Sequence, residues 1–302
     1  MKKVEIKGII PPIITPMHED ESINVEELRN QVNRQIEGGV HALFCFGTNG
    51  EGYILNGKDK ELVLRTVVEE TNGRVPVYAG TGCISTKETI EQSKMAMELG
   101  ADVLSIITPS FAAASQNELY EHYKAVAEAV DMPIVLYNIP ARTGNALAPA
   151  TVARLAQIEN IVGAKDSSGN FSNILSYINA GKAKKNGTFS TLSGNDQLIV
   201  WNLLAGGTGG IAGCANVYPH VMASIYDLFM AGKKEEAIAA NASIQSFRDC
   251  FKYGNPNTIV KTAVGLLGYN VGKCRAPFNQ VPEEGVEALK KVLAENAAKG
   301  MN

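Results

Sequence analysis

The chain has 302 residues, 45% of them hydrophobic, and its 28 basic and 31 acidic side chains give a net charge of −3. This length suits a βα-barrel domain with an extension, and the lack of a basic cluster argues against nucleic-acid binding. No run approaches a membrane span, no signal peptide is recognisable, and the five cysteines form no C-x-x-C pair. We therefore expect a cytoplasmic protein without disulfides.

Strand-like apolar runs recur along the chain at intervals typical of βα units. There are eight of them: 8–14, 41–46, 75–79, 102–107, 133–137, 161–165, 188–192 and 208–214. Amphipathic stretches with helix signals lie between the runs. In the first stretch, Asn24 is a candidate N-cap with Glu27 at the capping-box position, and Gly38 ends the periodic pattern. Ser85 and Ser115, each with a glutamate three residues later, repeat the start signal.

This alternation of strands and helices predicts an α/β fold with a mostly parallel sheet, closed as a (β/α)8 TIM barrel. Beyond the last run, helices are expected at 219–231, 234–251, 257–268 and 282–298. We therefore predict a catalytic barrel over 1–231 and a C-terminal helical extension over 232–302.

Candidate catalytic residues follow the strands, because barrel enzymes carry their chemistry at the carboxyl ends of strands. Lys165 ends an apolar run, and Tyr137 ends the run one βα unit earlier. An amine at the mouth of an apolar barrel loses hydration, which favours the neutral form that attacks carbonyl carbons. A surface lysine and a core tyrosine are the ordinary interpretation of each residue alone, but their pairing favours a catalytic one.

The second run ends in a turn with three glycines around Thr48 and Asn49. Such a turn allows backbone N–H groups to point at a small anion. The alternative is an ordinary βα turn in which Glu51 caps the next helix.

Two other patterns are given less weight. Residues 207–212 fit G-x-G-x-x-A, but the glycines precede the apolar run, so an NAD-dependent oxidoreductase is only a distant alternative. The four histidines, His18, His41, His122 and His220, lack metal-ligand spacing, so no metal is expected.

Three motifs resemble signatures of the dihydrodipicolinate synthase/N-acetylneuraminate lyase family. They are F-G-T-N-G-E at 46–51, Y-N-I-P-A-R-T-G at 137–144 and G-A-K-D at 163–166. The resemblance extends from 8–12 to 274–278. It implies a tetrameric barrel with a helical C-terminal extension that joins pyruvate to an aldehyde or splits the product, with neither a metal nor an organic cofactor.

The resemblance also implies roles for individual residues. Lys165 would form an imine with the keto carbon of pyruvate or a 2-keto acid, while Tyr137 and Thr48 would relay protons. The keto-acid carboxylate would bind the backbone N–H groups of Thr48 and Asn49. Gly210 and Ile211 would line the same pocket.

Other positions bear on the second substrate. Synthases usually have a threonine where this chain has Asn49, and a tyrosine lent by a neighbouring subunit where it has Phe111. Arg142 matches the arginine with which synthases hold aspartate semialdehyde. Ser167 occupies a place where sugar-acid lyases often carry a hydroxyl. Asn195 would likewise bind substrate hydroxyls, as would Asp196 unless it caps the next helix.

The preferred interpretation is a class I Schiff-base aldolase or lyase acting on a 2-keto-3-deoxy sugar acid or a similar 4-hydroxy-2-keto acid, as a homotetramer built as a dimer of dimers. The first alternative is 4-hydroxy-tetrahydrodipicolinate (dihydrodipicolinate) synthase, which condenses pyruvate with aspartate semialdehyde. An alternative of another class is a non-catalytic barrel that binds a keto acid. Which aldehyde is used, and in which direction the reaction runs, stays open.

Overall fold

The computed structural model of the chain describes residues 3–301, which fall into two units. The first unit contains the chain up to Gly8 together with Pro76–Ile211, and the second contains Ile9–Val75 together with the chain from Ala212 onward. This division is not the predicted one, and the boundary between 1–231 and 232–302 stays a prediction.

Each of the eight predicted runs overlaps a strand. The strand bounds are β1 Gly8–Ile10, β2 Leu43–Cys45, β3 Val77–Gly80, β4 Val103–Ile107, β5 Ile134–Asn138, β6 Ile161–Asp166, β7 Ser190–Ser193 and β8 Gly209–Ile211. Strands β3, β5, β6 and β7 each end one residue beyond the predicted run. The strands form one sheet in the order β1-β8-β7-β6-β5-β4-β3-β2, and from β3 to β8 each pairs in parallel with the next along the chain.

The first and last strands in this order, β1 and β2, are joined just beyond β1 by a parallel bridge between Pro12 and Phe44. There the N–H of Phe44 donates to the carbonyl of Pro11, and the N–H of Ile13 donates to the carbonyl of Phe44, both at 3.0 Å. Eight parallel strands that alternate with helices in this way form a (β/α)8 barrel, as the sequence predicts.

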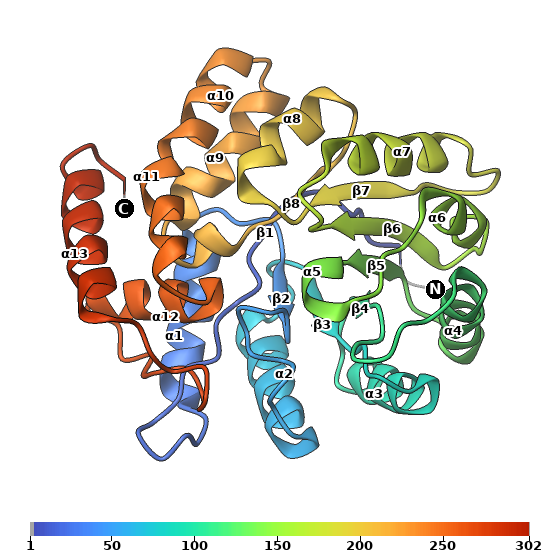
Figure 1. The fold of residues 1–302 in the computed structure, drawn as a ribbon, viewed down its shortest axis with the longest axis horizontal. Coiled ribbons are helices and arrows are strands. Elements are labelled where there is room, and N and C mark those ends of the chain that lie inside the picture. The colour runs from blue at the N-terminus through green and yellow to red at the C-terminus, as the bar shows by residue number, and fades with distance from the viewer. Residues whose placement is uncertain (1–2, 302) are drawn as a thin grey trace. The chain divides into compact units, whose positions relative to one another are not determined.

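The helices alternate with the strands up to β8 and then follow one another to the C-terminus (Figure 1). Their bounds are α1 Val25–Glu37, α2 Gly57–Thr71, α3 Thr86–Glu98, α4 Gln116–Ala129, α5 Pro140–Thr143, α6 Pro149–Leu155, α7 Phe171–Lys182, α8 Ile199–Leu204, α9 Pro219–Met230, α10 Lys234–Ser243, α11 Gln245–Arg248, α12 Pro256–Leu266 and α13 Glu283–Ala297. Three 3₁₀ segments complete the list: η1 Asp196–Leu198, η2 Gly213–Asn216 and η3 Asp249–Tyr253.

The predicted helix starts are confirmed at their caps. The side chains of Asn24, Ser85 and Ser115 accept hydrogen bonds from the backbone N–H three residues later. At Ser115 the capping box is complete, because the Glu118 side chain accepts the N–H of Ser115 in return.

Other element bounds differ from the prediction. The runs 8–14 and 208–214 are too long, since β1 ends at Ile10 and β8 ends at Ile211. Beyond Ile10 the chain has two prolines, which lack the N–H that a strand ladder needs. The predicted helix 234–251 is broken at Ile244 into α10, α11 and η3. None of the helices within residues 3–301 is both long and apolar enough to cross a membrane.

Candidate active site

Tyr137 and Lys165 face each other on neighbouring strands. They are paired residues of β5 and β6, so their side chains leave the sheet on the same side. Both are buried, at 3% and 4% exposure, and the Nζ of Lys165 lies 3.6 Å from the centroid of the Tyr137 ring. An amine and a phenol are therefore held together at the carboxyl ends of two parallel strands.

The residues that follow this pair tie the same two strand ends together. The amide of Asn138 donates to Oδ2 of Asp166 at 2.7 Å, and Asn173 of α7 donates to the same oxygen at 2.9 Å. Oδ1 accepts the backbone N–H and the hydroxyl of Ser168 at 3.1 and 2.6 Å. The side-chain oxygen Oδ1 of Asn138 also accepts the N–H of Leu147 at 2.9 Å. This buried network was not anticipated, and it holds β5 and β6 in register where the candidate residues lie.

Gly194, just after β7, lies against the lysine. A Cβ atom at this glycine would lie 1.9 Å from Oγ of Ser167 and 2.7 Å from Cε of Lys165. The structure thus brings the side chains of Ser167 and Lys165 close together, while the role of Ser167 in substrate binding stays a prediction. Its hydroxyl is buried and has no hydrogen-bond partner within the protein, so it is available to a bound molecule.

The predicted residues on β8 and after β7 are placed as follows. Asn195 accepts the N–H of Gln197 at 3.1 Å and caps η1, so the capping role proposed for Asp196 belongs to Asn195 instead. A Cβ at Gly210 would lie 2.5 Å from Ile199 of α8, and Ile211, the next residue, is buried. Their contact with substrate stays a prediction.

Arg142 lies in α5, a short helix that was not predicted, with Pro140 at its first turn and Gly144 in the left-handed conformation after it. The helix leaves Arg142 exposed. Pro140 and Gly144 were visible in the sequence, and they are the local signals that account for such a turn of helix.

Phe111 is 98% exposed and adopts a left-handed backbone with φ of 79°. Asn145 holds the loop that presents it: its amide donates to the carbonyls of Pro109 and Ala112 at 2.9 and 2.8 Å, and it accepts the N–H of Ala114 at 2.8 Å. Asn145 directly follows the R-T-G of the 137–144 motif. The sequence therefore shows where it lies, but not that it holds the loop that carries Phe111. The loop displays an aromatic side chain away from its own chain.

Thr48 and Asn49 belong to the other unit, in the turn after β2. The turn is close-packed: a Cβ at Gly50 would lie 2.6 Å from the carbonyl of Ile13, and one at Gly213 would lie 2.9 Å from the Asn49 amide. Tight backbone packing thus accounts for the glycines. The proton relay and the carboxylate site assigned to Thr48 and Asn49 stay predictions.

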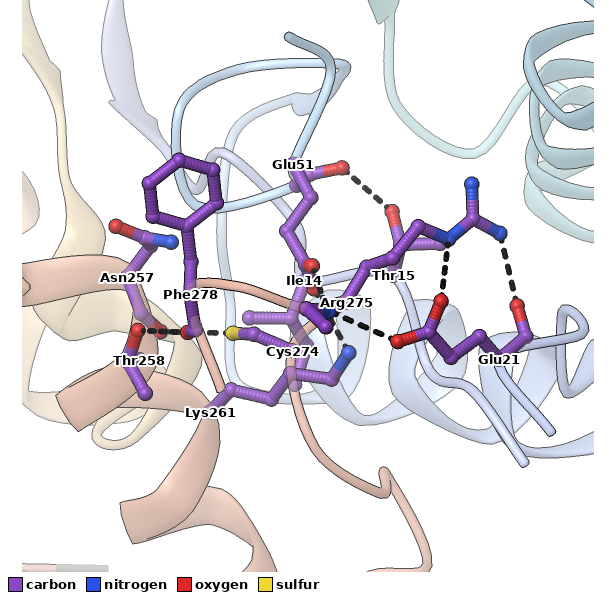
Figure 2. Close-up of polar contacts among 12 residues, drawn as sticks. Ile14, Thr15, Glu21, Glu51, Asn257, Thr258, Lys261, Cys274, Arg275 and Phe278 are labelled. Carbon is purple, nitrogen blue, oxygen red and sulfur yellow. Dashed lines mark hydrogen bonds and ion pairs between the residues drawn. The ribbon is translucent and has the colours of Figure 1, made fainter. Parts of the chain in front are cut away.

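The alternative interpretation of Glu51 as a helix cap is wrong. Helix α2 begins at Gly57, and Asn56 caps it by accepting the N–H of Asp59 at 3.0 Å. The carboxylate of Glu51 is instead fully buried and forms an ion pair with Lys261 of α12 (Figure 2). The two residues lie too far apart in sequence for a motif to reveal the contact.

The chain was compared with known proteins. A family model described as "Dihydrodipicolinate synthetase family" matches residues 5–296. The chain belongs to the dihydrodipicolinate synthetase family. A 4-hydroxy-tetrahydrodipicolinate synthase of Methanopyrus kandleri is 38% identical over 292 residues, which cover 96% of each chain.

Solved structures of the same family agree. The chloride-inhibited dihydrodipicolinate synthase of Acinetobacter baumannii, complexed with pyruvate, has a TM-score of 0.92 at 34% identity and covers 99% of this chain and 100% of its own. A structure described as the first monomeric dihydrodipicolinate synthase variant has a TM-score of 0.93 at 32% identity, covering 98% and 97%. The protein is therefore a class I Schiff-base lyase of the dihydrodipicolinate synthetase family, with the barrel that the sequence predicts.

Proposed function

We propose that this protein is a 4-hydroxy-tetrahydrodipicolinate synthase, which condenses pyruvate with aspartate semialdehyde through an imine on Lys165. The observation that carries the proposal is the buried pairing of Lys165 with Tyr137, with Nζ 3.6 Å from the ring centroid. The choice of aldehyde is supported by similarity to proteins named as this synthase at 36–38% identity. Aspartate semialdehyde therefore replaces a 2-keto-3-deoxy sugar acid as the preferred substrate.

In the proposed reaction, the Nζ of Lys165 attacks the keto carbon of pyruvate, and the adduct loses water to form an imine. Loss of a proton from the pyruvate methyl group gives an enamine, whose carbon attacks the aldehyde of the second substrate. The new alkoxide takes up a proton, and water or the product's own amino group then adds to the imine carbon, so that the carbon–nitrogen bond to Lys165 breaks and the lysine leaves as a free amine. Tyr137 transfers protons at each stage, with Thr48 as its relay partner.

Arg142 is proposed to hold the carboxylate of aspartate semialdehyde. It is the exposed cation of α5, two residues after Pro140 and five residues after Tyr137. A guanidinium binds a carboxylate through two parallel hydrogen bonds, which orients the aldehyde as well as attracting it.

A second candidate, a 2-keto-3-deoxy sugar acid or similar hydroxylated keto acid, is favoured by Ser167. Its hydroxyl lies beside Lys165, against Gly194, and is buried without a partner. A buried hydroxyl without a partner costs free energy, and a substrate hydroxyl would satisfy it. Asn49 and Phe111 also depart from the synthase pattern in this direction.

We further propose a cytoplasmic homotetramer. The exposed Phe111 is suited to enter a neighbouring subunit, and a second apolar face lies on α7 and α8, where Leu175, Trp201 and Leu204 are each at least 40% exposed. Such patches are typical of subunit contacts. One structural neighbour is a monomeric variant, so the assembly has to be measured for this protein. Sedimentation equilibrium measures it, and a monomer at micromolar concentration would refute the tetramer.

Borohydride trapping tests the chemistry. The protein is mixed with pyruvate, reduced with borohydride and digested, and the masses of its peptides are measured by mass spectrometry. We expect a reduced pyruvyl adduct on Lys165, none in Lys165→Met, and an unchanged adduct in Lys290→Met, whose lysine is exposed on α13. Thermal stabilisation by pyruvate without an adduct would support the non-catalytic barrel instead.

Turnover of aldehydes tests the substrate. We expect the wild type to prefer aspartate semialdehyde to any sugar-derived aldehyde, and Arg142→Ala to raise KM for aspartate semialdehyde while leaving the rate of pyruvate adduct formation unchanged. If Ser167→Ala lowers turnover of a 2-keto-3-deoxy sugar acid that the wild type handles faster than aspartate semialdehyde, the second candidate is correct.

A further inference from the structure

The turn that carries Thr48 and Asn49 is connected to the C-terminal helices through a buried charge. The carboxylate of Glu51 is 0% exposed and accepts a hydrogen bond from the Nζ of Lys261 at 2.7 Å, and the lysine is itself 1% exposed. The second carboxylate oxygen accepts the backbone N–H of Arg275, also at 2.7 Å. Figure 2 shows the Glu51 side chain extended from its loop toward both partners.

The backbone of this turn needs support. Glu51 and Phe46, which bracket Thr48, both adopt the left-handed conformation, with φ of 59° and 65°. This conformation is unfavourable for residues other than glycine and persists where the surrounding structure holds it. The hydroxyl of Thr15 donates to the carbonyl of Gly50 at 2.7 Å, directly before Glu51. The ion pair of Glu51 thus acts on a strained residue.

Further contacts extend the connection along the segment that follows β2. The amide of Asn257, at the start of α12, donates to the hydroxyl of Tyr53 at 3.0 Å, and the Tyr53 ring packs edge-on against Phe278 with centroids 5.3 Å apart. The guanidinium of Arg275 donates to Asp59 of α2 at 2.8 Å. The C-terminal segment therefore makes three contacts with two residues that follow the turn, Tyr53 and Asp59.

We propose that Glu51 and Lys261 are positioning residues, through which the C-terminal helices hold the turn so that Thr48 and Asn49 are presented to the substrate. The inference rests on the proposed function, because it assigns the pair a role in binding and converting pyruvate. Neither residue touches substrate. Their effect passes through the backbone between Phe46 and Glu51.

The test uses Lys261→Met, which keeps a similar volume and removes the charge that pairs with Glu51. We expect kcat/KM for pyruvate to fall about 100-fold, because displacing a reacting group by about 1 Å has an effect of this order. The same substitution at Lys290, which forms an exposed ion pair with Glu287 on α13, is the matched control and should leave kcat/KM unchanged.

Coupling to Thr48 separates positioning from general destabilisation. In a Thr48→Val background, whose hydroxyl relay is already lost, Lys261→Met should lower kcat/KM by only about tenfold, because the share that passes through the Thr48 hydroxyl is gone and only the share that passes through the backbone N–H groups of the turn remains. An equal loss in both backgrounds, or no loss in the wild-type background at a temperature where the variant is folded, would overturn the proposal.

Should Lys261→Met not fold, the double variant Lys261→Met with Glu51→Gln takes its place. It leaves no unpaired charge and keeps an acceptor for the N–H of Arg275, so it is expected to fold. Because the link from Nζ to the turn is missing, kcat/KM should still fall about tenfold or more, and wild-type kinetics would refute the proposal.

Failure of the proposed function gives a different result. If the wild type forms no borohydride-trapped adduct with pyruvate, the chemistry assigned to Lys165 is wrong. If the wild type is trapped and the Glu51 and Lys261 variants are trapped at the same rate with the same KM, only the positioning role is wrong.

Discussion

Lys165 lies with its Nζ 3.6 Å from the ring centroid of Tyr137, and the two residues are register partners on β6 and β5. Their separation therefore depends on the alignment of two strands and not on a flexible loop.

Removing the phenol should separate imine formation from proton transfer. Tyr137→Phe keeps the ring over Lys165, so pyruvate should still be trapped on the lysine, while turnover should fall about 100-fold or more because general acid–base catalysis is lost. Steady-state kinetics and mass measurement check this. Tyr123→Phe is the control, because it removes another buried hydroxyl. Tyr123 lies on α4, and its hydroxyl donates to the carbonyl of Ile106 on β4 at 3.0 Å. Equal kinetic losses in the two variants would contradict the role of Tyr137.

Gly194 should be intolerant of a single added methyl group. In Gly194→Ala the new Cβ would lie 1.9 Å from Oγ of Ser167 and 2.7 Å from Cε of Lys165, so both side chains must shift. We expect adduct formation to slow at least about tenfold, since small displacements of reacting groups are costly. Gly57→Ala is the matched control, because nothing lies within 4 Å of its Cβ. Normal trapping in Gly194→Ala would show that the lysine accommodates the methyl group.

The buried amide between the two strand ends should matter for both stability and rate. Asn138→Ala removes the donor to Asp166 and the acceptor for the N–H of Leu147. Unsatisfied buried groups of this kind lower the free energy of unfolding by about 2 kcal/mol or more, which urea denaturation measures. We also expect slower adduct formation with pyruvate. Asn173→Ala removes a bond to the same carboxylate oxygen but joins no strands, so its kinetic effect should be smaller. A larger effect at Asn173 would argue against the strand-tying role.

Stability should decrease in mild acid because of His122. Burial lowers the pKa of this histidine from 6.5 to about 4, and its Nδ1 lies 2.9 Å from the hydroxyl of Thr86 while Nε2 is buried without a partner. The unfolded chain binds a proton below its ordinary pKa and the folded chain does not, so stability present at pH 7 is lost as the pH falls from 6.5 toward 4.

Between pH 7 and pH 5 this one histidine should cost about 2 kcal/mol in the free energy of unfolding. His122→Gln keeps a polar group beside Thr86 and removes the titration, so the drop between the two pH values should be smaller by that amount. Denaturant unfolding of both proteins at pH 7 and pH 5 measures it. Identical pH dependence in the two proteins would mean that His122 is protonated in the folded state.

Much of the architecture could be read from local patterns. The spacing of eight apolar runs predicted the parallel strands, and cap residues such as Ser115 marked helix starts, because both signals act over a few residues. The same patterns placed Lys165 and Tyr137 at strand ends. Their pairing as register partners is a property of the packed sheet, in which the register of β5 and β6 shifts between Ile134 and Val135.

Local patterns failed where the outcome depended on distant segments. Glu51 looked like a helix cap, yet it pairs with Lys261, 210 positions away in sequence. Likewise, nothing near Gly194 in the sequence indicated that it packs against Lys165 and Ser167. A buried carboxylate needs a cation beside it, and which cation lies there depends on the packing of distant segments. Neighbouring residues in the sequence therefore do not reveal the partner.

Strand spacing and the residues at strand ends thus predicted the barrel and the position of the candidate amine, Lys165, because hydrophobic periodicity and helix capping are short-range effects. The fold determined how that amine is held: the Asn138 to Asp166 bond, the close approach of Gly194 and the buried pair of Glu51 and Lys261. Each needs two segments to be packed together before the hydrogen bond or contact can form, so only the packed chain reveals them.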